Sequence, residues 1–468
     1  MKLNKVKNVA VIGAGQTGID ISTYLVKNNI NVLLSEANKD VIINPRLIKN
    51  SYFRYEIGKN SEKCLESDLI IPSPGVSPAN KILIKAKKND LPVLSEIEFA
   101  FLKYTEKRTY KNIVAVTGTN GKTSTVQMIE FILNKSGIKA VACGNIGDPF
   151  INYVNYKGII VLEVSSFQLH YSFKFRPYIS VLLNIDEDHI EWHKTFQNYI
   201  EAKRKLFKNQ NPKDRMVLNF DDKRVLDLTK GIRVRKYYFS QTPLPLCKNE
   251  FDTATYEFEN GLILKDKKII HIINYKKYNE YEFNISGIQG IFRKNALASL
   301  LVCQILGIDV PTGIKKLSDF SVGDHRLETF YRNNGITYIN DSKSTNPLSV
   351  IAAIDSMNDK FVLVIGGYEK GLDYKNVKNR IKNSLCVGLI LYGPLGKRIH
   401  KEFSKDLSIK TILVNRIDDT IEAGVEILDG SGIFLFSPGT SSFDSFDNYK
   451  ERGDYFKRRV REWLKTKK

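Results

Sequence analysis

The sequence has few cysteines, and they form no recognisable pattern. Five cysteines are spread over 468 residues, with no C-x-x-C pair among them. A disulfide framework and a cysteine-based zinc site both need closely spaced cysteines at regular intervals, so the spacing argues against either. A reducing compartment, the cytoplasm, fits this cysteine usage.

Long apolar runs are also missing. No uninterrupted stretch approaches the roughly 20 residues that cross a bilayer. The apolar residues 9–12 follow several lysines but are too few for the core of a signal peptide. We therefore expect no membrane span and a cytoplasmic location.

The remaining composition is that of an ordinary folded protein. Hydrophobic residues make up 42% of the chain and charged residues 26%, which excludes collagen-like and wholly disordered classes. At roughly 150 residues per domain, the length predicts about three domains.

Basic residues outnumber acidic ones, 71 to 51, for a formal charge of +20. Such a charge suits an anionic partner. The lysines are spread along the whole chain, however, and clusters such as Lys457-Arg458-Arg459 lack RNA-binding signatures. We interpret the charge as composition combined with anionic small ligands, and expect a monomer whose partners are small molecules and not nucleic acid.

Short apolar runs alternate with amphipathic stretches, as in βαβ units that build parallel sheets. We predict three α/β domains in series: a Rossmann-like domain at 1–100, a P-loop domain at 101–322 and a second Rossmann-like domain at 323–468. Residues 236–281, with alternating polarity and the sequence Glu259-Asn260-Gly261, predict a small antiparallel insertion with a turn. Predicted strands lie at 8–12, 31–34, 68–71, 113–116, 159–162, 179–183, 336–339, 361–365, 389–391 and 433–436.

A G-x-G-x-x-G motif occupies residues 13–18 between a predicted strand and helix, and Glu36 ends the next strand. In this context the backbone approaches a diphosphate at a helix N-terminus, and the acidic side chain meets a ribose or base. The alternative is a purely structural tight turn. We interpret the motif as a nucleotide-binding loop.

A second glycine loop, T-G-T-N-G-K-T at residues 117–123, opens the predicted helix Lys122–Lys135. Its amides suit phosphates, Lys122 suits their charge, and the Thr123 hydroxyl suits Mg²⁺. Val116 stands where the strict Walker pattern has its first glycine. We predict an ATP site here, the alternative being a turn that only caps a helix.

Four further motifs accompany this loop: E-V-S-S-F-Q-L at 163–169, N-I-D-E-D-H at 184–189, D-H-R-L-E at 324–328 and N-D-S-K-S-T-N at 340–346. Together they resemble the Mur ligase family across essentially the whole chain. The first and last of the four resemble the member that adds D-glutamate to UDP-N-acetylmuramoyl-L-alanine. The resemblance implies an ATP- and Mg²⁺-dependent amide ligase that works through an acyl phosphate in the synthesis of peptidoglycan precursors.

The resemblance also implies roles for individual residues. The implied catalytic residues are Lys122, Glu163, His189, Lys203 and Lys343. Thr123 and Glu163 would hold one Mg²⁺, and His189, supported by a carbamylated Lys203, would help bind a second. ATP would contact Gly118, Thr119, Asn120, Gly121, Lys122, Thr123, Asn295, Arg326 and Asp341. The UDP-linked substrate would contact Gly15, Gln16, Thr17, Glu36, Ser73, Pro74, Gly75, Asn145, Ser165 and Gln168. D-glutamate would contact Thr345, Lys370, Ser442 and Phe443.

Two segments depart from the family pattern. The segment around Ser442 reads S-P-G-T-S-S-F-D in place of an alanine- and cysteine-containing version, and Phe292 and Lys294 stand where asparagine and histidine are usual. The first departure bears on D-glutamate recognition, and the second on recognition of the nucleotide beside Asn295.

Two other functions stay open at this point. A sibling ligase adding a different amino acid would differ only in the third domain. A basic, non-enzymatic protein that binds nucleotides or nucleic acid would keep the P-loop but have no use for Glu163, His189 and Lys203 together.

We expect the chain to bind DNA and RNA weakly and without sequence preference, because scattered lysines release few counterions at any one site. Fluorescence anisotropy between roughly 50 and 200 mM salt should show binding disappear. A tight complex at physiological salt would contradict this interpretation and support the nucleic-acid alternative.

Overall fold

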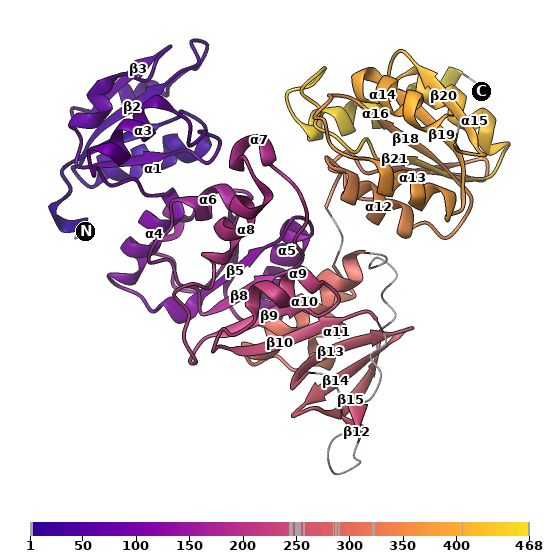
Figure 1. Cartoon of the computed structure of the whole chain (residues 1–468), viewed down its shortest axis with the longest axis horizontal. Coiled ribbons are helices and arrows are strands. Elements are labelled where there is room, and N and C mark those ends of the chain that lie inside the picture. Colours follow the sequence, from indigo (N-terminus) through magenta and orange to yellow (C-terminus); the bar gives the residue numbers. More distant parts are fainter. Residues whose placement is uncertain are drawn as a thin grey trace. The chain divides into compact units, whose positions relative to one another are not determined.

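The computed structural model describes residues 3–242, 247–248, 254–255, 258–283, 285, 288, 291–320, 323–404 and 406–466. The chain divides into two compact units: residues 1–284 with 294–319, and residues 285–293 with 320–468. Three α/β sheets follow one another along the chain (Figure 1). The predicted fold class, three α/β domains in series, is confirmed.

The first sheet has four parallel strands in the order β3-β2-β1-β4. They are β1 (Asn8–Ile12), β2 (Asn31–Glu36), β3 (Phe53–Ile57) and β4 (Leu69–Pro72). Helices α1 (Gln16–Lys27), α2 (Pro45–Ile48) and α3 (Lys81–Lys88) accompany them. Strand β3 was not predicted, because this edge strand buries one fully covered residue, Phe53, and has no continuous apolar run.

The central sheet has nine strands in the order β15-β14-β13-β10-β9-β8-β5-β7-β6. Their bounds are β5 (Ile113–Thr117), β6 (Ala140–Gly144), β7 (Ile159–Glu163), β8 (Ile179–Leu182), β9 (Arg215–Asn219), β10 (Arg235–Ser240), β13 (Asn260–Lys265), β14 (Lys268–Ile273) and β15 (Lys276–Glu282). In the sheet order, all neighbours from β13 through β10, β9, β8, β5 and β7 to β6 pair in parallel. Strand β14 pairs antiparallel with both β13 and β15. A separate two-stranded ribbon joins β11 (Cys247–Lys248) and β12 (Ala254–Thr255).

The antiparallel insertion predicted at 236–281 is therefore only partly correct. Strand β10 pairs in parallel with both neighbours, and the antiparallel part begins at β13. The predicted turn at Glu259-Asn260-Gly261 is wrong, because β13 starts at Asn260. A Cβ on Gly261 would lie 2.0 Å from the Tyr238 carbonyl oxygen. This glycine serves close strand pairing and not a reversal of the chain.

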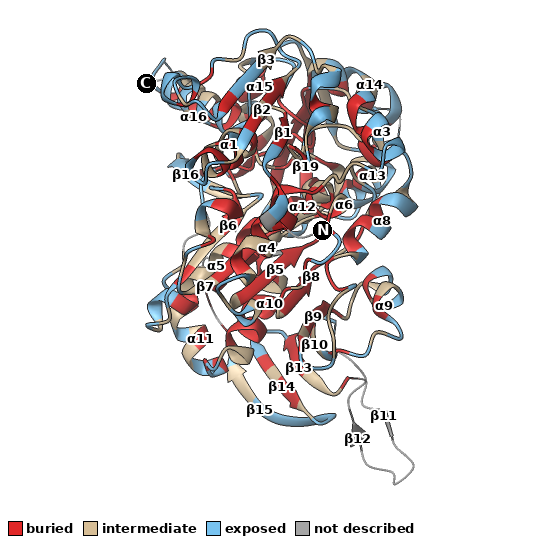
Figure 2. Ribbon diagram, turned by 90° about the vertical axis from the view of Figure 1, so that its left-hand side faces the viewer, coloured by how far each residue is buried: buried red, intermediate tan, exposed pale blue. Residues whose placement is uncertain are grey.

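Helices cover the central sheet, whose strands are mostly buried while the outer faces of the helices are exposed (Figure 2). The helices of this part are α4 (Glu96–Thr105), α5 (Lys122–Lys135), α6 (Ser166–His170), α7 (Ile190–His193), α8 (Phe196–Arg204), α9 (Lys223–Thr229), α10 (Ile291–Ile305) and α11 (Val310–Leu317). Short 3₁₀ turns lie at Leu3–Lys5, Glu62–Glu66, Tyr110–Asn112 and Phe150–Tyr153. In the described part of the chain, no helix is both long enough and apolar enough to cross a bilayer.

The third sheet has the order β16-β17-β21-β18-β19-β20, with all pairs parallel except β16 with β17. Its strands are β16 (Glu328–Asn333), β17 (Ile336–Asn340), β18 (Phe361–Gly366), β19 (Cys386–Tyr392), β20 (Lys410–Val414) and β21 (Gly432–Phe436). Its helices are α12 (Pro347–Asp355), α13 (Lys375–Lys382), α14 (Gly393–Phe403), α15 (Asp419–Leu428) and α16 (Tyr449–Thr466).

Candidate active site

The loop between β5 and α5 has the conformation that a phosphate-binding loop needs. Gly121 caps α5 in the left-handed region, at φ +85°, and a Cβ there would lie 2.5 Å from Oδ1 of Asn295. No side chain fits at this position without moving Asn295. The structure thus places Asn295, buried on α10, directly against the loop.

Side chains from the segment after β8 hold this loop in place. The Asn120 amide donates to Oδ1 of Asn184 at 2.8 Å, and the Asn184 side chain donates back to the Asn120 carbonyl at 3.1 Å. The Thr119 hydroxyl pairs with the Tyr199 hydroxyl at 2.9 Å and accepts from the Asp186 amide at 2.9 Å. Sequence reasoning missed Asn184 and Tyr199 as loop anchors, because nothing local to either residue marks the distant loop as its partner.

Two lysine ammonium groups converge on the same loop carbonyl. Lys122 Nζ donates to the carbonyls of Gly118 and Thr119, each at 2.7 Å, and Lys203 Nζ donates to Gly118 at 2.9 Å. Lys203 is only 1% exposed. Burial, reinforced by the charge of Lys122, holds the pKa of Lys203 well below its usual value. This side chain is therefore a buried amine with a strong tendency to be neutral, and not a solvated residue of a basic helix face.

Glu163 ends β7 beside the start of the loop, in register with Val116 of β5. Its Oε1 accepts from the Asn145 side chain at 2.9 Å, whereas its buried Oε2 has no hydrogen-bond partner among the described residues. A buried carboxylate oxygen without a partner is costly unless a cation or donor reaches it. Glu163 therefore has the chemistry to hold a divalent cation beside the loop, where the Thr123 hydroxyl is also buried.

His189 lies at the start of α7 with a positive φ of 56°. Its ring centroid is 4.6 Å from that of Phe167, and Asp188 and Glu191 each lie 3.6 Å from one of its ring nitrogens. Burial lowers the pKa of His189 despite these carboxylates, which favours the neutral, metal-binding form of the ring. In the described ranges no cluster of three or more His, Cys, Asp and Glu side chains is arranged to hold a metal.

The N-terminal glycine loop has a structural explanation for two of its glycines. Gly13 has φ +98°, and a Cβ on Gly18 would lie 1.9 Å from the Gly13 carbonyl oxygen. Gly15 faces open space, as does Gly75. Open space thus borders Gly15, just before α1 begins at Gln16, and contacts of Gly15, Gln16 and Thr17 with a ligand stay predictions.

The Glu36 carboxylate forms hydrogen bonds to the protein's own backbone. Its carboxylate accepts from the Ala14 amide at 2.6 Å and from the Asn38 amide at 2.7 Å. The acidic residue thereby fixes the glycine loop, and Ser73 does the same by donating to the Gly13 carbonyl at 2.9 Å. A direct contact between Glu36 and a ligand stays a prediction.

Ser165 and Gln168 form a capping box at the start of α6. The Ser165 hydroxyl accepts from the Gln168 amide at 3.3 Å, and Gln168 Oε1 accepts from the Ser165 amide at 3.0 Å. The spacing S-x-x-Q is the known signature of such a box, and sequence reasoning overlooked it. Both side chains thus have a local structural role beside the contact with the substrate that was predicted for them.

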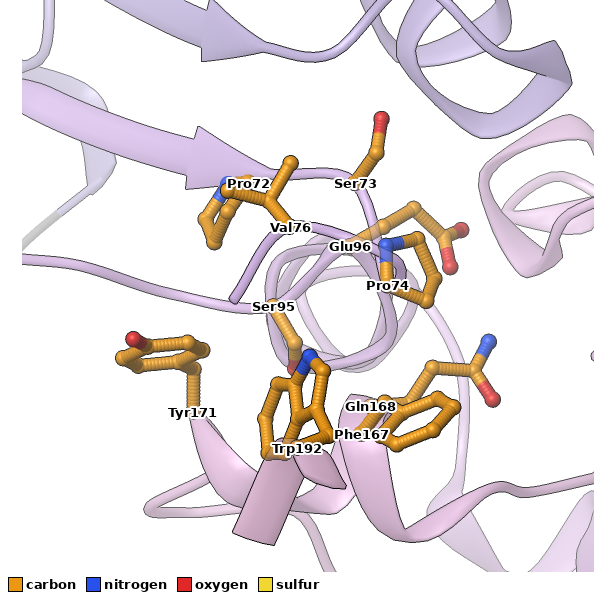
Figure 3. Close-up of a pocket in the computed structure, with 10 residues that line it drawn as sticks. All are labelled: Pro72, Ser73, Pro74, Val76, Ser95, Glu96, Phe167, Gln168, Tyr171 and Trp192. Carbon is orange, nitrogen blue, oxygen red and sulfur yellow. The ribbon is translucent and has the colours of Figure 1, made fainter. Parts of the chain in front are cut away.

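Ser73, Pro74 and Gln168 also line a small pocket together with Glu96 (Figure 3). The pocket has about 10 Å³ of free volume, about enough for one water molecule. In Figure 3 the Glu96 carboxylate and the Gln168 amide point to the same side of the pocket. Burial raises the pKa of Glu96 to about 7. The pocket brings together three residues that were predicted to bind the UDP-linked substrate.

The second unit gathers the D-S-K-S-T-N segment by hydrogen bonds to neighbouring loops. Asp341 is buried and accepts from the Leu327 amide at 3.2 Å and the Ser437 hydroxyl at 2.8 Å. Burial raises the pKa of Asp341 to about 7. The Lys343 ammonium lies 5.3 Å from the centre of the Tyr449 ring. Asp341 and Lys343 therefore lie on one fixed segment, and Arg326 immediately precedes Leu327.

Arg452, which sequence reasoning missed, joins this segment to the loop that carries Ser442. Its guanidinium donates to the Ser342 hydroxyl at 3.0 Å, the Ser342 carbonyl at 2.7 Å and the Thr440 carbonyl at 2.9 Å. Arg452 is 1% exposed, although its neighbours in the sequence are charged residues of an ordinary surface helix. Ser442 is buried, whereas Lys370 and Phe443 are exposed, Phe443 to 72%.

The unusual residues before Asn295 have partners of their own. Phe292 is buried, and Lys294 Nζ forms an ion pair with Oδ2 of Asp221 at 3.0 Å. Asn295 keeps its place against Gly121, and its side-chain nitrogen has no partner among the described residues. The substitutions at 292 and 294 thus leave the amide beside the loop available.

Known proteins resemble the chain over almost its whole length. Residues 7–95 match the family model of the MurD-like Mur ligase N-terminal domain, residues 116–303 the Mur ligase middle domain and residues 325–438 the Mur ligase glutamate ligase domain. A protein of Elusimicrobium minutum named UDP-N-acetylmuramoylalanine--D-glutamate ligase is 34% identical over 97% of both chains. A protein of the same name from Caldanaerobacter subterraneus is 32% identical over 97% of this chain and 98% of its own.

Solved structures agree at the level of the fold. MurF ligase of Thermotoga maritima in complex with ADP superposes with a TM-score of 0.59 at 16% identity, over 98% of this chain and 97% of its own. A pseudomurein peptide ligase type C of Methanothermus fervidus gives 0.57 at 20% identity, over 98% of this chain and 100% of its own.

Replacing Gly121 by alanine should weaken ATP binding at least tenfold, because the new Cβ strains the left-handed backbone and displaces Asn295. Calorimetric titration with ATP measures this. Gly137→Ala is the matched control, since Gly137 follows the other end of α5 with φ +81° and open space around it. The control should cost about 1 kcal/mol of stability and leave ATP binding intact. Equal ATP affinity in both variants would contradict the assigned role of the loop.

Proposed function

The chain belongs to the Mur ligase family, and on that premise we propose that it joins D-glutamate to UDP-N-acetylmuramoyl-L-alanine at the expense of ATP. The products are the new amide, ADP and phosphate. One observation supports this proposal above the others. Relatives from several bacteria are named after this activity, and they align with nearly the whole chain at 30% identity or more.

The reaction needs a carboxylate to be activated before an amine attacks it. The terminal phosphoryl group of ATP passes to a carboxylate oxygen of the substrate, which forms an acyl phosphate and releases ADP. The amine of D-glutamate then attacks the acyl carbon, phosphate leaves, and the amine loses a proton. Little covalent chemistry is left to the protein, so its residues act by positioning and by charge.

The phosphate-binding loop supplies the first of these contributions. Its backbone N–H groups and Lys122 face the phosphates in this proposal. The ammonium of Lys122 now bonds to the carbonyls of Gly118 and Thr119, so it has to exchange these partners for phosphate oxygens. Asn184 and Tyr199 keep the loop in shape during this exchange. Asn295 would contact the nucleotide from α10.

Thr123 and Glu163 would hold one Mg²⁺ beside the loop, and His189, supported by a carbamylated Lys203, would help bind a second. The unpartnered Oε2 of Glu163 and the lowered pKa of His189 both suit a divalent cation. When bound, such ions would neutralise charge on the phosphoryl oxygens and orient them.

The surroundings of Lys203 support its proposed carbamylation. A neutral amine forms a bond between Nζ and the carbon of CO₂ and releases one proton, so the reaction needs a deprotonated lysine. Burial and the charge of Lys122 lower the pKa of Lys203 and supply that form. The product carries a negative charge, which the ammonium of Lys122 would attract.

The third domain would hold D-glutamate. The exposed ammonium of Lys370 is suited to a carboxylate, and Thr345 and Ser442 supply hydroxyl donors. Arg452 supports this arrangement by tying the segments around Ser342 and Thr440 together. Arg326, Asp341 and Lys343 would face the nucleotide from the same unit, and Phe443 would complete the D-glutamate pocket.

Phosphate release measured with ATP, UDP-N-acetylmuramoyl-L-alanine and a panel of D- and L-amino acids tests the function directly. We expect turnover with D-glutamate alone. Lys122→Ala should lower kcat by about 10² or more, since its charge is preorganised for the phosphates. Turnover with another amino acid would identify a sibling ligase, and full activity of the Lys122 variant would refute the loop assignment.

Lys370→Met should raise KM for D-glutamate at least tenfold and leave KM for ATP nearly unchanged, because a carboxylate loses its charge-assisted hydrogen bond. Lys375→Met, at an exposed lysine nearby on α13, is the matched control. Initial rates against each substrate measure both constants. An equal rise of the two KM values would show that Lys370 contacts a phosphate group or stabilises the fold, and does not bind D-glutamate specifically.

Lys203→Ala should be almost inactive, and acetate or formate should restore part of the activity by occupying the place of the lost carbamate. Arg204→Ala serves as the control, since this neighbouring side chain is about half exposed. Steady-state rates with and without acetate or formate measure this rescue. Substantial activity of Lys203→Ala without any added acid would rule out the carbamate.

A further inference from the structure

A cavity of about 550 Å³ in the second unit is assigned to no substrate by the proposed function. It is lined by Tyr392 at the end of β19, residues 393, 394 and 397 of α14, residues 415–417 after β20, residues 444–446 and Tyr455 of α16. This volume falls in the usual range of small-molecule sites. None of the residues predicted to contact ATP, the UDP-linked substrate or D-glutamate lines the cavity.

The cavity lies where nucleotides bind in open α/β sheets. Strands β19 and β20 are parallel neighbours that end at Tyr392 and Val414, and their carboxyl ends lead into the cavity wall. Helix α14 starts there and runs for eleven residues, so its positive N-terminal end faces the same region. Ligands of such sheets occupy the crevice outside the carboxyl ends of the strands.

The side chains of the wall offer two cations. Lys397 is exposed and has no ion pair among the described residues, and the guanidinium of Arg416 is 73% exposed while it contacts Asp418 at 3.2 Å. The two cations suit an anionic ligand.

The rest of the wall suits a planar ring with hydroxyl groups. The rings of Phe446 and Tyr455 lie 5.3 Å apart, centroid to centroid, and form an apolar surface. The Asp444 carboxylate, which also lines the cavity, can accept hydrogen bonds, as acidic residues do from ribose hydroxyls in nucleotide sites. A free inorganic anion would contact only the two cations, and it would make no contact with the two rings or the Asp444 carboxylate.

We propose that this cavity is a second nucleotide site, which binds a nucleoside phosphate. Lys397 and Arg416 hold the phosphate at the start of α14, Phe446 and Tyr455 pack against the base, and Asp444 accepts from the sugar.

Both walls of the cavity continue into loops that the proposed function assigns to D-glutamate, so this step rests on that function. Asp444 follows Ser442 and Phe443 directly in the sequence. On the other side the Leu395 amide donates to the Gly367 carbonyl at 3.0 Å, and Gly367 begins the loop that leads to Lys370. Occupation of the cavity therefore shifts KM for D-glutamate.

Direct binding is measured on the full chain with the other sites filled by a non-hydrolysable ATP analogue and UDP-N-acetylmuramoyl-L-alanine. AMP, GMP and UMP are then titrated and followed by calorimetry, with inorganic phosphate and the free nucleosides as further probes. We expect one saturable site for at least one nucleoside monophosphate and weaker binding of phosphate or nucleoside alone. No binding, or binding of phosphate as tight as that of the best nucleotide, overturns the proposal.

Lys397→Glu combined with Arg416→Glu should weaken nucleotide binding at least tenfold, and Ser445→Trp should do the same by filling the cavity without changing a charge. Lys401→Glu is the matched control, because this exposed lysine lies on the same helix outside the cavity. Binding that persists in both cavity variants, or is lost equally in the control, refutes the site.

Initial rates at saturating ATP and UDP-linked substrate give the functional readout. The nucleotide should change KM for D-glutamate at least threefold in the natural chain and not in the cavity variants. An unchanged KM despite binding refutes the coupling. A chain without any ligase activity refutes the proposed function, whereas the binding titration still decides on the second site.

Discussion

The convergence of two lysines on the Gly118 carbonyl is the constraint around which the first unit is arranged. An ammonium group can be buried only where acceptors surround it and where its charge is reduced or compensated. Lys203 meets the first condition through Gly118 and the second through a lowered pKa. Helix α8, which carries Lys203 and Tyr199, is thereby tied to the loop between β5 and α5.

Buried polar groups mark the other positions where loops from different strands must meet. Glu163 stands beside Val116 in the central sheet, Glu96 lies under the Ser73–Pro74 turn, and Arg452 joins two loops of the third sheet. Each lies at or near the carboxyl ends of parallel strands, where loops leave the sheet and helices begin. Hydrogen bonds to these buried groups tie together loops that leave the sheets, although one oxygen of Glu163 and one of Glu96 have no partner among the described residues.

Single motifs contain both residues that stabilise the local backbone and residues that are predicted to contact ligands. In the N-terminal loop Gly13 and Gly18 are required by close backbone contacts, whereas Gly15 borders open space. In the segment after β7, Ser165 and Gln168 cap a helix, while Glu163 leaves an oxygen without a partner. A sequence motif therefore combines residues that the fold needs with residues that are predicted to contact ligands, and the structure distinguishes the two groups.

The sequence by itself determined the elements whose signals are local. Buried parallel strands such as β1, β5 and β18 are short continuous apolar runs, and the glycine loop before α5 is recognisable from seven consecutive residues. Strands β3, β6, β9 and β20 are among those that escaped prediction. Three of them are partly exposed edge strands, but β9 is a buried central strand whose apolar residues 216–218 were overlooked. Asn260-Gly261 was wrongly predicted as a turn because a glycine serves close strand pairing as well as turns. Only the tertiary structure decided that Lys203 and Arg452 are buried, that Glu36 bonds to the loop it follows and that Asn295 touches Gly121. Burial and partnership are properties of residues far apart in the chain, and no pattern confined to one segment contains them.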